Sequence, residues 1–105
     1  MKLVDLIPYL GNSNNLEQLL VEQNLNMDSE AIIICMENSL DIDAEIYFFE
    51  IEQTEGNLVF ERDGIRYIEL FPAYHALEIV ESYLLPSDDN QKIANRLLEY
   101  RINDA

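Results

Sequence analysis

The spacing of apolar residues predicts a helical beginning, a strand-rich middle and a helical end. We expect a short helical turn over residues 6–10, which Asp5 can cap. The turn can contain Pro8 because proline is tolerated in the first turn of a helix. A helix over 14–24 follows, capped by the polar residues 12–14. Its apolar side chains lie three or four positions apart: Leu16, Leu19 and Leu20.

Residues 29–40 are ambiguous between helix and strand. Three consecutive isoleucines at 32–34 favour a strand, because β-branched side chains fit a pleated sheet. The preceding Asp28, Ser29 and Glu30 are typical of a helix start, and Ile32, Ile33, Met36 and Leu40 share one helical face. On balance we expect a helix over 29–40.

The middle of the chain predicts three strands, over 45–53, 57–62 and 65–71. In the first of them one face holds Tyr47, Phe49 and Ile51, and the other face holds Ile46 and Phe48. In the third, one face holds Ile65, Tyr67 and Phe71. The pair Asp63-Gly64 is a strong hairpin signal, because a two-residue type I′ turn needs positive φ at both positions. We therefore expect a three-stranded antiparallel meander.

The last third of the chain predicts two helices. Pro72 can begin the first, whose apolar stripe is Ala73, Ala76, Leu77, Val80 and Leu84. Pro86 ends it, and Ser87 can cap a final helix with a buried side formed by Ile93, Ala94, Leu97, Leu98 and Ile102. The expected fold class is α+β in a single domain over 1–105, with the N- and C-terminal helices packed on one face of the meander.

Composition adds one unusual property, which is charge. The chain of 105 residues is 49% hydrophobic, and its 21 Asp and Glu against 6 Lys and Arg give a net charge of −15. This charge argues against binding nucleic acid or an anionic membrane, since both are polyanions. A cationic partner would be attracted, with association accelerated roughly 10- to 1000-fold.

The charge is also unevenly distributed. Residues 3–61 contain no Lys or Arg, whereas the basic residues other than Lys2 lie in the last 44 positions. The acids in this stretch are Asp5, Glu17, Glu22, Asp28, Glu30, Glu37, Asp41, Asp43, Glu45, Glu50, Glu52, Glu55 and Glu61. Solvated surfaces usually mix both signs, so acids without local partners indicate a surface that pairs with another molecule.

Residues that could support catalysis or metal binding are few. The alternation of Asp41, Asp43 and Glu45 is similar to a calcium loop but lacks its central glycine. His75 is the single histidine and has no matching nucleophile, while Cys35 lies in an apolar run and cannot form an internal disulfide. We therefore expect no enzyme activity, no metal and no cofactor. The sequence shows no secretion signal and no apolar run of membrane-spanning length, so a cytoplasmic location is expected.

In size, acidity and lack of a catalytic motif the chain resembles the small acidic immunity proteins of bacterial toxin systems, including contact-dependent growth inhibition and nuclease bacteriocins. The resemblance matches no motif and assigns no residues. It implies tight one-to-one binding that neutralises a basic toxin domain, often a nuclease. The partner-binding residues that we expect from charge density are Asp41, Asp43, Glu45, Glu50, Glu52 and Glu55.

Two alternatives remain open at this point. The first is a regulatory or adaptor module that binds a protein without neutralising a toxin. The second is a small enzyme, which would need a deep pocket around His75 or around a close carboxylate pair with perturbed pKa values. The oligomeric state is not determined by the sequence.

Overall fold

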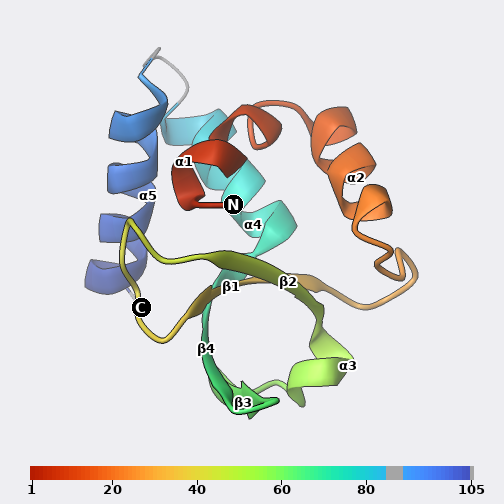
Figure 1. Ribbon diagram of the computed structural model, residues 1–105. Coiled ribbons are helices and arrows are strands. Elements are labelled where there is room, and N and C mark those ends of the chain that lie inside the picture. Colours follow the sequence, from red (N-terminus) through yellow and green to blue (C-terminus); the bar gives the residue numbers. More distant parts are fainter. Residues whose placement is uncertain (85–88, 105) are drawn as a thin grey trace.

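The computed structural model describes residues 1–84 and 89–104, and it shows an α+β fold. Four strands form one sheet: β1 (Ile32–Glu37), β2 (Ile46–Glu50), β3 (Val59–Arg62) and β4 (Ile65–Pro72). The helical elements are α1 (Leu3–Leu6), η1 (Ile7–Tyr9), α2 (Ser13–Glu22), α3 (Ile51–Thr54), α4 (Ala73–Ile79), the π-helical η2 (Val80–Leu84) and α5 (Asn90–Asp104). Helices α1, α2, α4 and α5 lie on one side of β1 and β2, and the sheet curls away from them so that β3, like α3, lies at the far end of the molecule from these helices (Figure 1).

The expected fold class is confirmed, but the expected three-stranded meander is wrong. The sheet has four antiparallel strands in the order β2-β1-β4-β3, so the segment over 29–40 contributes a central strand instead of a helix. Five of the six residues in β1 are buried, because helices cover one of its faces and aromatic rings the other. A strand buried on both faces has a continuous apolar run, whose periodicity cannot be distinguished from that of a buried helix.

The main hydrophobic core lies between the sheet and the helices. Alternate residues of β1, namely Ile32, Ile34 and Met36, contact it together with Ile46 of β2. The helices contribute an aliphatic layer of Leu3, Leu6, Leu16, Leu20, Ala73, Ala76, Leu77, Val80, Ile93, Ala94, Leu97 and Leu98. These residues include most of the stripes predicted from the helical spacing.

The opposite face of the sheet has a second, smaller cluster that is rich in aromatic residues. Its buried members are Ile33, Cys35 and Tyr67, with partly buried Phe49, Phe60 and Ile65 packed against them. The rings of Phe49, Phe60 and Tyr67 have centroids 5.0–5.5 Å apart. We call this surface the aromatic face. Of the predicted alternation in β2, Tyr47 and Phe49 on one face and Ile46 and Phe48 on the other are confirmed, but the strand ends at Glu50 because α3 begins at Ile51.

A β-bulge in β4 changes the predicted alternation of the third strand. Ile34 pairs with Phe71 and Cys35 pairs with Glu69, so Leu70 is an extra residue on the β4 side. Leu70 and Phe71 therefore both face the helices, and the prediction that Phe71 shares a face with Tyr67 is wrong. A bulge disturbs the backbone hydrogen bonds locally. Here the carbonyl oxygen of Glu69 accepts a hydrogen bond from Nε of Arg101 at 3.2 Å.

Several predicted turns and caps are confirmed or shifted by a few residues. Asp63 and Gly64 have φ of 53° and 80°, as the hairpin prediction requires. The side chain of Asn12 caps α2 by accepting from the backbone of Asn14 and Asn15. Asp5 lies inside α1 and accepts from the backbone of Lys2, so the first helix begins earlier than predicted.

Helix α5 begins after Asp89, whose carboxylate accepts from the backbone N–H groups of Gln91 and Lys92 at 3.0 and 3.3 Å. The predicted helix end at Pro86 and cap at Ser87 lie outside the described residues. Ile102 is 54% exposed instead of buried, because Arg101 faces β4 at this turn of the helix.

Candidate protein-binding surface

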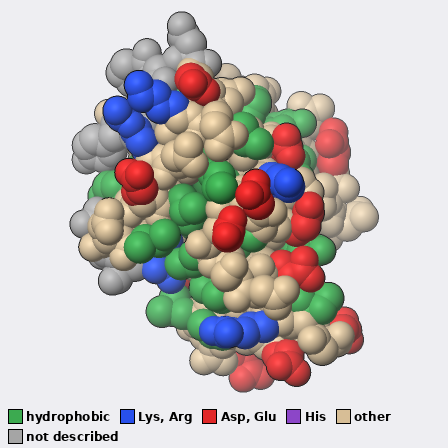
Figure 2. Space-filling model, turned by 60° about the vertical axis from the view of Figure 1, so that its left-hand side comes forward, with side chains coloured by type: hydrophobic (Ala, Val, Ile, Leu, Met, Phe, Trp, Pro, Cys, Tyr) green, Lys and Arg blue, Asp and Glu red, His purple; other side chains and the backbone are tan. Residues whose placement is uncertain are grey.

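The thirteen carboxylates between residues 3 and 61 lie almost entirely at the surface. Eleven are exposed, and Glu37 and Glu50 are partly buried. Within residues 1–84 and 89–104, two ion pairs of 4.0 Å or less are formed: the N-terminal ammonium with Glu45 at 2.7 Å, and Lys2 with Asp43 at 4.0 Å. Figure 2 shows carboxylates spread over one side of the molecule, with Lys and Arg at separate places among them and hydrophobic side chains between. The acidic surplus predicted from the sequence is therefore largely uncompensated within the described chain.

The structure divides the six predicted partner-binding residues into two groups. Asp41, Asp43 and Glu45 lie in the loop between β1 and β2. Glu50, Glu52 and Glu55 lie at the other end of β2, in and around α3. The five residues of β2 separate the groups by about 17 Å, at roughly 3.3 Å per residue. These acids form one dense run along the sequence, whereas in the folded protein they lie at two separate places.

The first group surrounds a hollow of about 390 Å³, which we call the acidic hollow. Its lining residues are Glu37, Asn38, Ser39, Asp41, Asp43, Ala44 and Glu45. The loop is held by local hydrogen bonds: Oδ1 of Asp41 accepts from the backbone N–H of Asp43 at 2.8 Å, and the Asp41 carbonyl accepts from Ala44 at 3.0 Å. Because these bonds already hold the loop in place, ligand binding at the hollow costs little additional conformational entropy.

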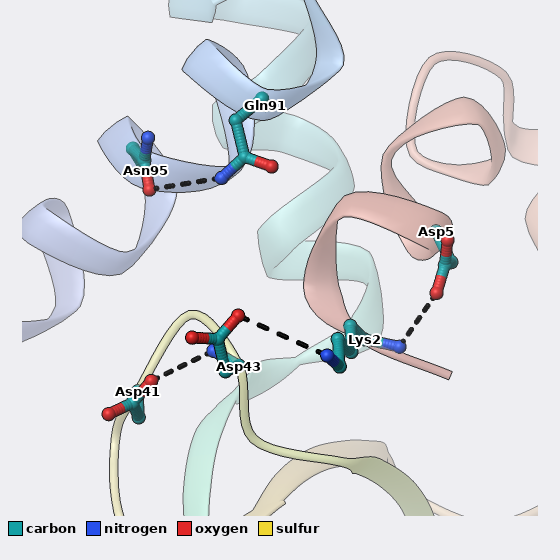
Figure 3. A network of polar contacts seen from close by, with 6 residues as sticks. All are labelled: Lys2, Asp5, Asp41, Asp43, Gln91 and Asn95. Carbon is teal, nitrogen blue, oxygen red and sulfur yellow. Dashed lines mark hydrogen bonds and ion pairs between the residues drawn. The ribbon is translucent and has the colours of Figure 1, made fainter.

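Two cations of the chain itself lie at the rim of the acidic hollow. Figure 3 shows Lys2 reaching across from the start of α1 to Asp43. Both side chains are well exposed, at 47% and 81%, so the pair contributes little stability and is easily exchanged. The amino group of Met1 contacts Glu45 at the same rim. Asp41 and Glu37 form no ion pair within the described residues.

The second group has structural contacts that the sequence did not indicate. Oε2 of Glu50 accepts from the backbone N–H of Asn26 at 3.1 Å, and Oε1 of Glu52 accepts from the Ser29 hydroxyl at 2.6 Å. These bonds hold the connection between α2 and β1 against α3. Glu55 has a left-handed backbone with φ of 54° at the end of α3. Glu50 and Glu52 are thus less free than Asp41 and Asp43 to pair with another molecule.

A second hollow of about 330 Å³ adjoins the aromatic face, and we call it the aromatic hollow. It is lined by Gln23, Asn24, Leu25, Phe48, Phe49, Glu50, Gln53, Arg62, Asp63 and Tyr67. Burial raises the pKa of Tyr67, with smaller contributions from Tyr47, Glu37 and Asp63, while Arg62 opposes the rise. Of these residues, sequence reasoning placed only Glu50 among the partner-binding residues, because the lining joins three separate stretches of the chain, at 23–25, 48–53 and 62–67.

The residues considered for catalysis, His75 and Cys35, are absent from the linings of both hollows. His75 is exposed on α4, with its ring 5.5 Å from that of Phe71. Cys35 is completely buried, and burial together with the charge of Glu69 raises its pKa from 9.0 to about 12, which disfavours the reactive thiolate. In the described part of the chain, no three His, Cys, Asp or Glu residues are grouped so that they could hold a metal ion. No helix there has the length and apolar character needed to cross a bilayer.

Comparison with protein-family models, curated proteins and solved structures gave no match for this chain. The functional argument therefore depends on the charge, the two hollows and the surface contacts described above.

Proposed function

We propose that this protein is an immunity-type inhibitor, which binds a basic toxin domain in a one-to-one complex and neutralises it. The observation behind the proposal is the acidic surface: of thirteen early carboxylates, two form ion pairs within the described chain. A net charge of −15 costs folding stability through self-repulsion. A cationic partner recovers this cost when it binds, so the surplus favours association with a basic protein.

The acidic hollow is the best centre for such an interface. Asp41 and Asp43 are exposed, Asp41 holds only its own turn, and the one contact of Asp43 with another described segment is the weak, exposed pair with Lys2. Carboxylates around a concave surface can accept guanidinium groups in a bidentate manner, which is stronger than pairing between single exposed charges. If the toxin is a nuclease, the same carboxylates would occupy positions where its basic residues otherwise bind phosphate. The hollow would then block the toxin by direct competition with its substrate.

Charge reversal tests the role of the acidic hollow. The partner is first isolated by pull-down from the native organism, and its binding is measured for the triple variant Asp41→Lys, Asp43→Lys, Glu45→Lys. The matched control is Glu17→Lys, Glu22→Lys, Glu61→Lys, three exposed carboxylates elsewhere with the same change in net charge. We expect the hollow variant to slow association by roughly tenfold or more and to lose most of the salt dependence, with a much smaller effect in the control. Equal effects in the two variants would show that only net charge matters.

Growth rescue distinguishes an inhibitor from an adaptor. Cells that produce the partner are tested with and without co-expression of this protein. We expect the partner alone to arrest growth and the pair to grow normally. Tight binding to a partner that is harmless alone would contradict the inhibitor proposal and favour the adaptor alternative.

A further inference from the structure

The aromatic hollow, which adjoins the aromatic face, combines ring faces with carboxylates. Phe49 and Tyr67 contribute rings whose centroids are 5.0 Å apart, and Glu50 and Asp63 contribute the acids. Gln23, Asn24 and Gln53 add side-chain amides to the lining. Ring faces carry negative electrostatic potential and attract cations, most strongly when solvent is partly excluded. The lining therefore has the chemistry of a receptor for an organic cation.

One cation of the chain already uses this chemistry. The guanidinium carbon of Arg62 lies 5.7 Å from the centroid of the Phe49 ring. Within the described residues Arg62 forms no ion pair, so the ring, and not a carboxylate, is its identified partner. Arg62 is exposed at the end of the edge strand β3, opposite Ile65 in the hairpin. Its side chain can leave the ring by rotation, without any change in the backbone.

The outer edge of β2, beside the hollow, presents backbone groups that do not pair with β1. In β2 the N–H groups of Ile46 and Glu50 point away from β1, and they donate to the Met1 carbonyl and to Oε1 of Gln53. By the alternation of an antiparallel ladder, the N–H and C=O of Phe48 point in the same direction. Phe48 lines the hollow, and within residues 1–84 and 89–104 these two groups have no hydrogen-bond partner, so a bound group could pair with them.

We propose that the aromatic hollow receives one arginine side chain of a partner protein, which displaces Arg62 from the face of Phe49. Arginine is favoured over lysine because its flat guanidinium stacks on rings and donates to carboxylates in a fixed fork. Glu50 and Asp63 supply the negative charge, and the net charge of −15 attracts a basic partner. This inference holds whether or not the partner is a toxin, so it extends beyond the inhibitor proposal.

A small probe tests the site without a partner protein. N-acetyl-arginine amide is titrated into the wild-type protein and into Arg62→Gln and Arg66→Gln, with ring and backbone NMR signals as the readout. Arg66 is the matched control, because it is exposed, lies in the same hairpin opposite Glu61, and is absent from the hollow. We expect shifts at Phe49 and Tyr67, and binding by Arg62→Gln roughly two- to fivefold tighter than by Arg66→Gln, since the internal competitor is gone. Equal affinities, or shifts confined to the acidic hollow, would overturn the proposal and leave the inhibitor proposal intact.

A ring substitution provides the second test. Phe49→Leu keeps an apolar side chain in the aromatic face but removes the ring, and the circular dichroism spectrum reports whether the variant is folded. We expect the folded variant to lose the shifts at Tyr67 on addition of the probe, and N-acetyl-lysine amide to bind the wild type more weakly than the arginine probe does. Unchanged binding in Phe49→Leu, or equal binding of the two probes, would contradict the proposal. If the leucine variant does not fold, the comparison of Arg62→Gln with Arg66→Gln decides the question.

Discussion

The two faces of the sheet are both apolar, yet they differ in side-chain type and in covering. The face under the helices is aliphatic and closed: Ile34, Met36 and Leu70 are at most 1% exposed. The aromatic face is a single layer of rings, in which Tyr47 is 38% exposed and Phe49 and Phe60 are partly buried. The first face provides most of the packing, while the second leaves large side chains in contact with solvent.

This difference places the closely packed aliphatic side chains and the solvent-accessible rings on opposite sides of the same strands. Aliphatic side chains between two layers gain most from burial, and they lose most when atoms are removed. Aromatic rings bury large areas even when one edge remains wet, and their faces can still attract a cation, as Phe49 attracts Arg62. The first two predictions below test whether the aromatic face is as tightly closed as the helix-covered face, and the next two test the contacts of β4 at the bulge.

The largest expected effect concerns the reactivity of Cys35, which lies on β1 beneath the aromatic rings. Its pKa is raised from 9.0 to about 12, a difference of about three units, which lowers the thiolate fraction about a thousandfold at a given pH. We expect iodoacetamide at pH 8 to modify the native protein at least that much more slowly than the urea-unfolded protein. The rate is followed by mass spectrometry. Native modification at a rate near that of the unfolded chain would mean that the aromatic face opens frequently.

Truncation of neighbouring isoleucines compares the packing of the two faces directly. Ile34 faces the helices and Ile33 faces the rings, and they are 0% and 1% exposed. We expect Ile34→Ala to lower the free energy of unfolding by about 4 kcal/mol and Ile33→Ala by about 2 kcal/mol, because a thin layer can relax into the space. Urea unfolding with a common slope measures both. An equal or larger loss for Ile33→Ala would show that the aromatic face is packed as firmly as the other.

Arg101 tests the bulge that places Leu70 and Phe71 on the helix-covered face. Its Nε–H bond to the Glu69 carbonyl joins α5 to β4. We expect Arg101→Met to reduce stability by about 1 kcal/mol, since the methionine keeps the apolar stem and removes the donor. The control is Arg96→Met, which is exposed on the same helix. Thermal or urea unfolding that gives the same result for both variants would show that the bond contributes nothing.

The smallest expected effect is the pH dependence caused by Glu69. Burial raises the pKa of this carboxyl above its usual 4.5, and the nearby charge of Arg101 opposes the rise only in part. The folded state therefore holds the proton more tightly than the unfolded state, so stability falls as pH rises from about 4.5 through the folded pKa. We expect Glu69→Gln to remove this fall and to be more stable than wild type at pH 7, by a small amount because the carboxyl is partly exposed. Glu61→Gln, which is exposed on β3, corrects for the general relief of negative charge.

Most helices and turns could be predicted because their signals are local. Asp63 and Gly64 have the positive φ that their residue types favour, and the leucine spacing of α2 and α5 reports their buried sides. The strand character of β1 could not be predicted with the same rules, because burial by two different layers removes the alternation on which those rules depend. The bulge at Leu70 was also beyond prediction, since it is defined by pairing with Ile34 and Cys35, more than 30 positions earlier.

The candidate sites show the same division between local and long-range information. The acidic hollow is a single loop, so its acids at 41, 43 and 45 could be selected from sequence density alone. The aromatic hollow needs α2, β2, α3 and the β3–β4 hairpin to be assembled, and Arg62 gave no sequence signal because its partner, Phe49, is 13 positions away. Charge density likewise could not reveal that Glu50 and Glu52 hold the connection between α2 and β1.

The strand order has a consequence for how the chain reaches its native state. The pairs β1–β2 and β3–β4 are hairpins that close over short distances along the chain, whereas β1–β4 joins residues 30 to 39 positions apart, from Glu37 with Tyr67 to Ile33 with Pro72. Because long loops are slower to close, we expect docking of the two hairpins to limit the folding rate. Mutations in the hairpin at Asp63 would then mainly slow folding, because the hairpin forms before the barrier, while mutations at the β1–β4 seam would change both the folding and the unfolding rate. Stopped-flow φ-values near zero across the seam would exclude docking as the limiting step.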